Sequence, residues 1–353
     1  MTISASGVVS AADIRTEYGL SGTVSFADLY RGGSYIRAKA ANNNATNLAS
    51  SVPTSGEITL DNFRGTAKGF RYTFTTGATD QNASTLFGSD YGVNYPKEIV
   101  INSGVELGAT TTSNRALICP AGVSGSLSIT NNGTLTGAGG AAGAAGGDAF
   151  EAAVACVFVN NGTIRAGGGG GGTGGQGFTQ STTNQNAYQL YYCYIVTVWA
   201  GRHRYWWGNS GGCGNPHSGW ACQNCCTSTS CGSNPLYTYS TGHPDEPFSG
   251  CHSGCSGSQK NYKRVHKATT TTNYYNGGAG GVGAGYNQSA GTGAAGGTNA
   301  GAGGNGGAFG SSGNAGANGN NTNGTAGGGA GAYIRGISFV TLTQSGTVLG
   351  GTA

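Results

Sequence analysis

Apolar and polar residues alternate along much of the chain after its first segment. From about residue 67 the period is two, and Phe70, Tyr72 and Phe74 alternate with polar residues, which is typical of a half-buried strand. Short apolar runs then recur, and each is broken by a turn of the Asn-Gly or Ser-Gly type. The pattern predicts a chain built mainly from short β-strands.

One strand-and-turn phrase recurs at a fixed interval. Its turn glycines Gly104, Gly133 and Gly162 lie 29 residues apart each time, and a weaker copy occupies 343–350. Such spacing indicates stacked repeats, in which each unit buries its apolar residues against its neighbours. We expect each repeat to be a strand, a turn and a second short strand, with positive φ at the turn glycine.

Residues 1–66 carry a different pattern. Ser21–Gly32 is echoed, one residue shorter, by Ser55–Gly65. In both copies a Ser or Thr precedes an apolar residue and is followed three positions later by Asp or Asn, which predicts a capped helix. Ser10 and Asp13 repeat the form. The expected core of these short helices is Ile14, Tyr18, Phe26, Leu29, Leu60 and Phe63. A unit so small is marginal alone, so we predict a docking module that binds a partner protein.

Glycine tracts follow the second and third repeats, at 137–147 and 167–177, and a long tract at 277–332 precedes the last copy. The chain has 71 glycines and only 8% charged residues. A flexible linker is one possibility, and collagen is excluded because the long tract lacks both proline and a strict glycine at every third position. The third possibility is a bundle of extended polyglycine II helices, whose N–H and C=O groups bond between neighbours. A structureless insertion of this length within a compact domain is unusual, so the sequence favours the bundle.

A segment of different composition, 178–276, interrupts the glycine tracts and holds eight of the ten cysteines. Disulfides commonly hold together a loop-rich module that has no core, and the sequence does not choose among their pairings. The even count and the adjacent Cys225-Cys226 favour disulfides. The candidates are Cys193, Cys213, Cys222, Cys225, Cys226, Cys231, Cys251 and Cys255.

Zinc binding and free thiols are the alternatives for this insert. Two cysteine pairs have the spacing of zinc ligands and have histidines nearby, namely Cys222 with Cys225, Cys251 with Cys255, His217 and His252. Because disulfides are favoured, we expect no metal and no cofactor. Cys119 and Cys156 lie beside strand repeats and are expected to be buried as small apolar residues.

Aromatic residues and cations gather in the same insert. Aromatic faces beside cations and amides are a common means of gripping sugar rings or protein loops. Many of these rings are expected to form the insert's own core. The contact candidates are Trp206, Trp207, Tyr205, Arg202, Arg204 and Trp220.

Several function classes are disfavoured. In the insert the acidic residues are Asp245 and Glu246, and adjacent carboxylates on one turn rarely flank a glycosidic bond. No nucleophile elbow, zincin helix or P-loop is present. The net charge is +4, without the dense basic stripe of nucleic-acid binders. The N-terminal residues predict neither a signal peptide nor a membrane span. We therefore expect a protein that is not an enzyme.

The combination resembles the glycine-rich adhesins of tailed-phage fibre tips. The resemblance lies in the Asn-Asn-Gly-Thr turns, the hexaglycine run and the ending 332–342. It implies a platform of glycine helices whose loops bind an outer-membrane protein or surface glycan. It also implies a virion tail location after synthesis in the host cytoplasm, contact with other phage tail or baseplate proteins, and a homotrimer or a single copy on a trimeric fibre. Known loops of this kind are short, whereas this insert is large.

The prediction is thus a mainly β protein with polyglycine II helices. Residues 1–66 form a virion-docking module that contains helices, and 67–177 form strand repeats with the first glycine tracts. Residues 178–276 are a disulfide-rich insert, and 277–353 are a glycine tract with C-terminal strands. The expected function is host recognition by a phage tail protein. The alternative is an architectural baseplate or fibre-connecting protein without receptor contact.

Overall fold

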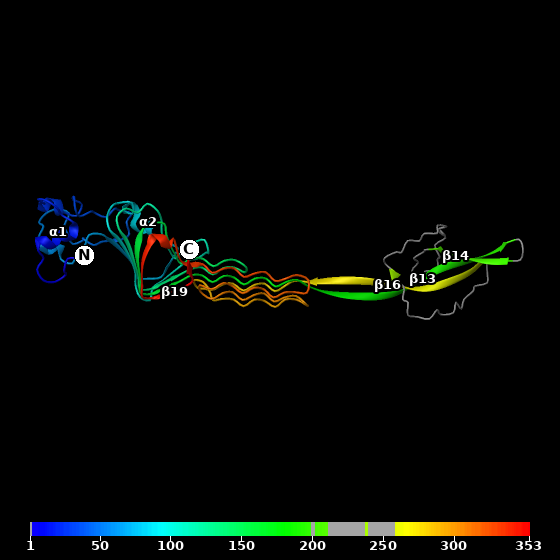
Figure 1. Ribbon diagram of the computed structural model, residues 1–353. Coiled ribbons are helices and arrows are strands. Elements are labelled where there is room, and N and C mark those ends of the chain that lie inside the picture. The colour runs from blue at the N-terminus through cyan, green and yellow to red at the C-terminus, as the bar shows by residue number, and fades with distance from the viewer. Residues whose placement is uncertain (1, 199–201, 211–236, 239–257) are drawn as a thin grey trace. The chain divides into compact units, whose positions relative to one another are not determined.

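The computed structural model of the chain describes residues 2–198, 202–210, 237–238 and 258–353. The chain forms two compact units, one of Met1–Phe178 with Tyr274–Ala353 and the other of Thr179–Asn273. Figure 1 shows their elements. Among the described residues strands dominate and helices are few and short, in agreement with the mainly β class.

Three short helices near the N-terminus begin with the predicted caps. They are α1 (Ala11–Tyr18) and the 3₁₀ helices η1 (Phe26–Leu29) and η2 (Leu60–Phe63). In each, the N-cap backbone N–H donates to an Asp or Asn side chain three residues later, at 2.7 to 3.0 Å. This bond closes a capping box. A two-residue strand, β1 (Thr46–Asn47), lies between η1 and η2.

The core of this N-terminal module differs in part from the prediction. Four of the expected residues are buried, namely Ile14, Tyr18, Leu29 and Phe63. Phe26 and Leu60 are wrong predictions, since they are 54% and 37% exposed. Both stand first in a four-residue 3₁₀ turn, which buries its last apolar residue and leaves its first at the surface.

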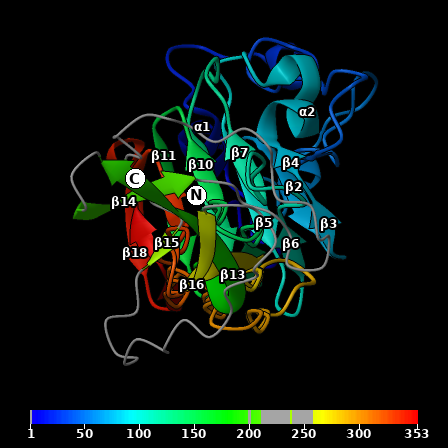
Figure 2. The same cartoon turned by 90° about the vertical axis from the view of Figure 1, so that its right-hand side faces the viewer.

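The middle of the larger unit is a three-sided parallel β-helix. Its sheets have the orders β1-β2-β5-β8-β11-β18, β19-β12-β9-β6-β3 and β20-β17-β10-β7-β4, and Figure 2 shows many of these strands side by side. Each of the five rungs contributes one strand to each sheet. The first two rungs are β2 (Phe70–Phe74), β3 (Ala78–Thr79), β4 (Gln81–Asn82), and β5 (Lys97–Ile101), β6 (Glu106–Gly108), β7 (Leu117–Cys119). The other three are β8 (Leu127–Asn131), β9 (Thr134–Thr136), β10 (Phe150–Ala152); β11 (Cys156–Asn160), β12 (Thr163–Arg165), β17 (Ala332–Arg335); and β18 (Val340–Gln344), β19 (Thr347–Leu349), β20 (Gly351–Thr352). The 3₁₀ helix η4 (Ile337–Phe339) joins β17 to β18.

Each predicted repeat corresponds to one rung. Ile129 pairs with Ile99 below and Phe158 above in the first sheet, and Leu135 lies between Leu107 and Ile164 in the second. The predicted strand, turn and second strand are therefore present. A third strand in each rung was not predicted, because strands of two to four residues such as β4 or β17 are too short to show a period.

The predicted positive φ is confirmed at one turn glycine, and the others are needed for a different reason. Gly104 has a positive φ of 78°, but Gly133, Gly162 and Gly346 do not. A Cβ on Gly162 would lie 2.0 Å from the Gly133 carbonyl oxygen, and one on Gly346 would lie 2.0 Å from that of Gly162. Successive corners stack so closely that no side chain fits between them.

Amide side chains connect the same corners inside the β-helix. Asn131 Nδ2 donates to Asn160 Oδ1 at 2.7 Å, and Asn160 Nδ2 donates to Gln344 Oε1 at 3.2 Å. Both asparagines are fully buried. Buried amides are tolerated only when they are bonded, so this ladder fixes the register of three rungs.

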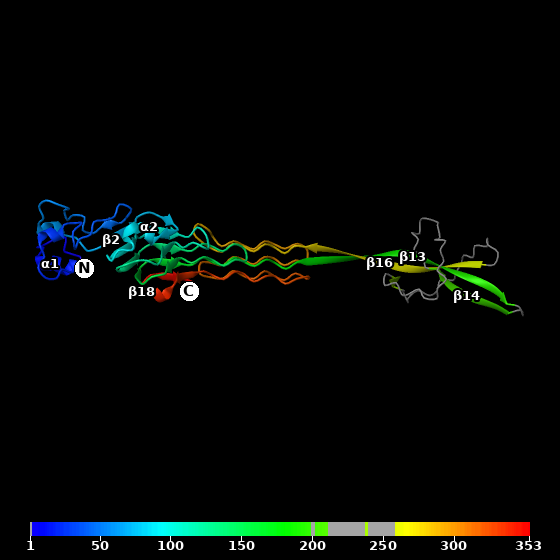
Figure 3. The ribbon, with the colours of Figure 1, turned by 90° about the horizontal axis from the view of Figure 1, so that it is seen from above.

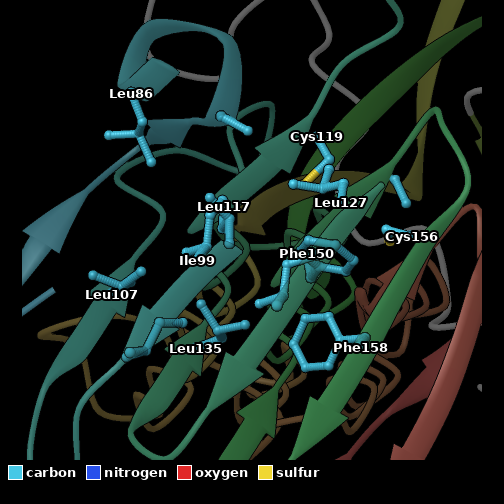
Figure 4. Packing of buried hydrophobic residues seen from close by; sticks show 14 of the residues in the cluster. Leu86, Ile99, Leu107, Leu117, Cys119, Leu127, Leu135, Phe150, Cys156 and Phe158 are labelled. Atoms are coloured by element: carbon cyan, nitrogen blue, oxygen red, sulfur yellow. The ribbon is translucent and has the colours of Figure 1, made fainter. Parts of the chain in front are cut away.

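Aromatic and aliphatic side chains fill the β-helix (Figure 4). The rings of Phe150 and Phe158 meet edge to face, with centroids 4.8 Å apart. Cys119 and Cys156 are buried and unpaired, as predicted. Burial raises the pKa of the Cys156 thiol to about 11, so this group stays protonated and apolar at neutral pH.

Two short helices, α2 (Ala83–Phe87) and η3 (Gly88–Asp90), close the first-rung end. Asp90 is fully buried there and accepts hydrogen bonds from Arg37 Nε, the Ala40 amide and Asn43 Nδ2 at 2.8 to 3.0 Å. Burial alone would raise the pKa of Asp90, but these three donors outweigh it and hold the pKa below its ordinary value. The carboxylate thus joins the N-terminal module to the β-helix.

Asp90→Asn is expected to lower the free energy of unfolding by about 3 kcal/mol at neutral pH, since an amide nitrogen would face groups that can only donate. A carboxyl with a depressed pKa stabilises the fold above its unfolded pKa near 3.9 and loses this effect as the pH falls through its folded pKa. Denaturant unfolding should therefore separate the variant from the natural chain at pH 7 and bring them together in strong acid. Asp61→Asn, at an exposed ion pair, is the control and should change little.

Glycine segments leave the β-helix at one corner, between the second and third sheets. They occupy g1 (137–141), g2 (144–147), g3 (167–177), g4 (277–285), g5 (291–297), g6 (301–308), g7 (311–319) and g8 (324–331). Figures 1 and 3 show them side by side. We call this set the glycine bundle. None of its segments belongs to a helix, and apart from the first residue of β13 none is in a strand, so their backbone groups must be bonded in another way.

Segment g3 is the centre of the bundle. Its amides at 168, 171 and 174 donate to g4, those at 169, 172 and 175 to g7, and those at 167 and 170 to g2, all at 2.7 to 3.0 Å. Its carbonyl oxygens accept from g6 and from g8 with the same period of three, and the Gly168 oxygen accepts from Gly140 in g1. Neighbouring segments of this ring also bond to one another. Consecutive residues of g3 therefore face different neighbours.

The sequence of g3 matches these surroundings. A Cβ on Gly169 would lie 1.9 Å from the Gly328 oxygen, and one on Gly170 would lie 1.8 Å from the Ala141 oxygen. Beyond the turn that ends g1, the face that met g1 and g2 is open. Thr173 and Gln176 stand there, and their amides donate at 2.7 to 2.8 Å to the hydroxyls of Thr325 and Thr322. Glycine gives way to larger residues where a neighbour is missing.

The smaller unit contains a four-stranded sheet with the order β14-β13-β16-β15. The strands are β13 (Gly177–Val198), β14 (Arg202–Ser210), β15 (Tyr237–Thr238) and β16 (Ser258–Tyr275). β13 and β14 pair antiparallel, and so do β15 and β16.

Candidate functional site

Ion pairs fix the corner where the glycine segments return to the β-helix. The carboxylate of Asp148 contacts Arg335 Nε at 2.5 Å and Arg115 at 3.1 Å. It also accepts from the Ala332 amide at 2.7 Å. The side chain of Asp148 is 6% exposed, where charge pairing is stronger than at the surface. The ends of g2 and g8 are thereby held to the same point.

Aromatic residues at two bundle turns rest on the β-helix. The guanidinium carbon of Arg165 lies 4.0 Å from the ring centroid of Phe309, in a cation–π arrangement. The ring of Tyr286 packs on Gly108, where a Cβ would lie 2.0 Å from the ring. Both contacts limit motion at the base of the bundle.

The opposite end of the bundle carries a cluster of amide side chains, which we call the distal amide cluster: Gln176, Asn299, Asn320 and Asn321. Asn320 Oδ1 accepts from the Phe178 amide at 2.7 Å, and its Nδ2 donates to the Phe178 oxygen at 3.0 Å. Asn321 Nδ2 donates to Gln176 Oε1 at 2.6 Å. From a second turn, Asn299 Nδ2 donates to the Phe178 oxygen at 3.2 Å, so two bundle turns are joined to the root of the insert.

The surface around the distal amide cluster is polar and uncharged. No Asp, Glu, Lys or Arg occurs in 274–331. Tyr274 is 62% exposed, and its ring centroid lies 6.4 Å from that of Phe178. Exposed amides with an aromatic face can hydrogen-bond and stack on a sugar or a protein loop. The arrangement suits binding and shows no group placed for acid–base chemistry.

Five of the six predicted contact residues lie on one strand. Arg202, Arg204, Tyr205, Trp206 and Trp207 all belong to β14. In the register with β13, Trp206 pairs with Tyr194 and Trp207 with Cys193. The sixth candidate, Trp220, lies outside the described residues. The structure thus places five of the six candidates on one strand of the β13–β14 pair.

The predicted disulfides stay a prediction. Cys193 lies on β13. The other seven candidates, Cys213, Cys222, Cys225, Cys226, Cys231, Cys251 and Cys255, lie outside the described residues. Within the described residues no three His, Cys, Asp or Glu side chains are grouped as metal ligands would be. No described helix has the length and apolar character of a membrane span.

Sequence reasoning missed the distal amide cluster. The sequence pattern that could have revealed it is the run Asn318 to Asn323, which is rich in asparagine within a tract of glycine and alanine. Such a run marks a turn. Its proximity to Gln176 and Phe178 depends on the packing of segments that are far apart in sequence.

Comparisons with known proteins place the chain in a family. A family model described as phage tail fibre adhesin Gp38 matches residues 69–353. A chain from the crystal structure of the gp37-gp38 adhesin tip complex of the bacteriophage S16 long tail fiber is similar, with 16% identity and a TM-score of 0.37 over 85% of this chain and 88% of that one. No curated protein matches. Because the family model covers most of the sequence, the chain belongs to the phage tail fibre adhesin family Gp38.

Proposed function

We propose that this tail fibre adhesin is a non-enzymatic receptor-binding protein that recognises the host cell surface with the insert and the distal amide cluster. Family membership makes it a component of the phage virion tail. The observation that carries the proposal is the lateral bonding of g3 to all of its neighbours. Such bonding turns a flexible composition into a firm support for loops.

The glycine segments are, in this proposal, polyglycine II helices. That geometry has three residues per turn and no internal hydrogen bonds. It accounts for amides that point to a new neighbour at each residue and return to the same neighbour after three. It also accounts for Cβ positions blocked by neighbouring carbonyl oxygens.

The N-terminal module is the proposed attachment to other tail proteins. It precedes the part of the chain that the family model matches. Val8, Phe26 and Leu60 are exposed on it, to 92%, 54% and 37%, and exposed apolar residues on a small module favour docking. The proposed assembly is a homotrimer or a single copy on a trimeric fibre, made in the host cytoplasm and carried on the virion.

The proposed receptor is an outer-membrane protein or a surface glycan. Tyr205, Trp206 and Trp207 with Arg202 and Arg204 on β14 supply aromatic and cationic groups. Trp and Arg are the residue types that dominate binding energy at interfaces. In this proposal Trp220 is a further receptor contact, and disulfides hold the insert together.

The joint replacement Trp206→Ala and Trp207→Ala tests the receptor role. Loss of two central aromatic contacts is expected to weaken adsorption of phage particles to host cells about 100-fold, since each is worth roughly 1 to 2 kcal/mol or more. Adsorption would be measured on particles shown to carry the adhesin. Phe339→Ala, an exposed aromatic residue on the β-helix, is the control and should adsorb normally. Unchanged adsorption of the double variant would favour the architectural role.

A further inference from the structure

Asn-Gly pairs occur six times in the chain and are chemically reactive. In such a pair the glycine backbone nitrogen can attack the asparagine side-chain carbonyl carbon. Ammonia leaves, and water opens the resulting succinimide to aspartate or isoaspartate, so no further reagent is required. Glycine, which has no Cβ, hinders the attack least. The asparagines are Asn132, Asn161, Asn276, Asn305, Asn318 and Asn323.

Hydrogen bonds decide which of these pairs can react in the folded chain. Attack requires the glycine N–H to leave its acceptor and the backbone to move, so a bonded amide must first open locally. Five of the six amides have an acceptor. Gly162, Gly306 and Gly319 donate to backbone oxygens at 2.9 Å. Gly133 and Gly324 donate to the Oδ1 atoms of Asn131 and Asn318 at 3.2 and 3.0 Å.

Gly277 differs from the other five. Within the part of the chain that the structure describes, its N–H has no hydrogen-bond acceptor. Asn276 is exposed and stands between the end of β16 and the start of g4. The nucleophile is therefore unblocked, and the asparagine side chain is accessible to water.

We propose that Asn276 is a self-modification site, at which the folded adhesin converts Asn276 to isoaspartate and aspartate while the other five Asn-Gly pairs react more slowly. The product adds a negative charge to 274–331, which otherwise has none. Isoaspartate also lengthens the backbone beside Gly277, where a Cβ would lie only 1.9 Å from the Gly174 oxygen. The modification thus strains the junction between the insert and the bundle.

Peptide mapping by mass spectrometry tests this proposal without reference to host binding. The purified full chain would be held at physiological temperature and mildly alkaline pH, and isoaspartate would be quantified at each pair over time. Asn276 is expected to react at least about fivefold faster than any other pair, because in the others the glycine amide must first break its hydrogen bond. In denaturant, where all six amides are released, the rates should converge.

Two variants sharpen the result. Asn276→Gln removes the succinimide-forming group and should abolish the modification of the folded chain. Asn318→Gln is the matched control and should leave the modification at Asn276 unchanged. An unmodified Asn276, or a faster reaction at any of the five bonded pairs, would overturn the proposal.

Discussion

Replacement of Gly328 by alanine is expected to lower the free energy of unfolding by about 3 kcal/mol or more, although it adds a single methyl group. The new Cβ would lie 1.9 Å from the Ala144 oxygen and 2.2 Å from the Ala144 carbonyl carbon. Both are backbone atoms and cannot turn aside. Segment g8 would have to separate from g2, which would also strain the 2.7 Å bond from the Gly328 amide to the Gly170 oxygen.

The next residue provides the matched control. A Cβ on Gly329 would meet nothing within 4 Å, and its φ is not positive. Gly329→Ala should leave stability unchanged or raise it by about 0.5 kcal/mol, since alanine restricts the unfolded chain. Denaturant unfolding of both variants makes the comparison. Equal effects at the two positions would show that g8 does not pack against g2 as described.

Removal of the central amide of the corner ladder has the second large expected effect. Asn160→Ala should cost about 3 kcal/mol, because Asn131 and Gln344 each lose a partner and Asn131 stays fully buried. The variant should also loosen the last rung, which would appear as faster amide exchange in β18. The exposed neighbour Asn161 makes a similar bond, to Asn132 at 2.9 Å.

Asn161→Ala is therefore the control for Asn160→Ala. Exposed amides exchange a partner for water at little cost, so a loss of less than about 1 kcal/mol is expected. Thermal unfolding of both variants, under one set of conditions, compares them. A larger loss for Asn161→Ala than for Asn160→Ala would contradict the assigned role of burial.

Local patterns made part of the fold predictable. Ser10 with Asp13, and the two echoed phrases, indicate capped helices because capping depends on residues three apart. The 29-residue interval indicates stacking for a similar reason, since each rung repeats the same neighbours. The third strand of each rung was not predictable in this way. Strands such as β4 (Gln81–Asn82) form because they pair with adjacent rungs, and their own sequence shows no pattern.

The period of three in the glycine tracts could have been found but was obscured. Glycine recurs at 313, 316 and 319 in g7, and non-glycine residues recur at 302, 305 and 308 in g6. The position of glycine within the three-residue period shifts at every turn, so no strict period spans 277–332. The glycine content of a segment follows the number of its faces on which a Cβ would collide with a neighbour: all three in the middle of g3, two in g6 and one in g7.

The candidate site was less predictable than the fold. Composition alone singled out Trp206 and Trp207, because aromatic and basic residues are concentrated in the insert. The distal amide cluster depends on which turns meet at the end of the bundle. That is fixed by how the glycine segments are arranged around g3, and no local pattern in Asn299 or Asn320 reports it.

Amide hydrogen exchange across 167–177 in the intact protein tests the central claim most directly. If g3 is bonded on every face, its amides should exchange slowly along the whole segment, including consecutive glycines that face different neighbours. Ser289 and Ala290, which are exposed at the turn between g4 and g5 and whose amides have no acceptor among the described residues, should exchange much faster. Rapid exchange throughout 167–177, at the rate of that turn, would contradict the account, because the bundle would then be a flexible linker and could not support a binding surface.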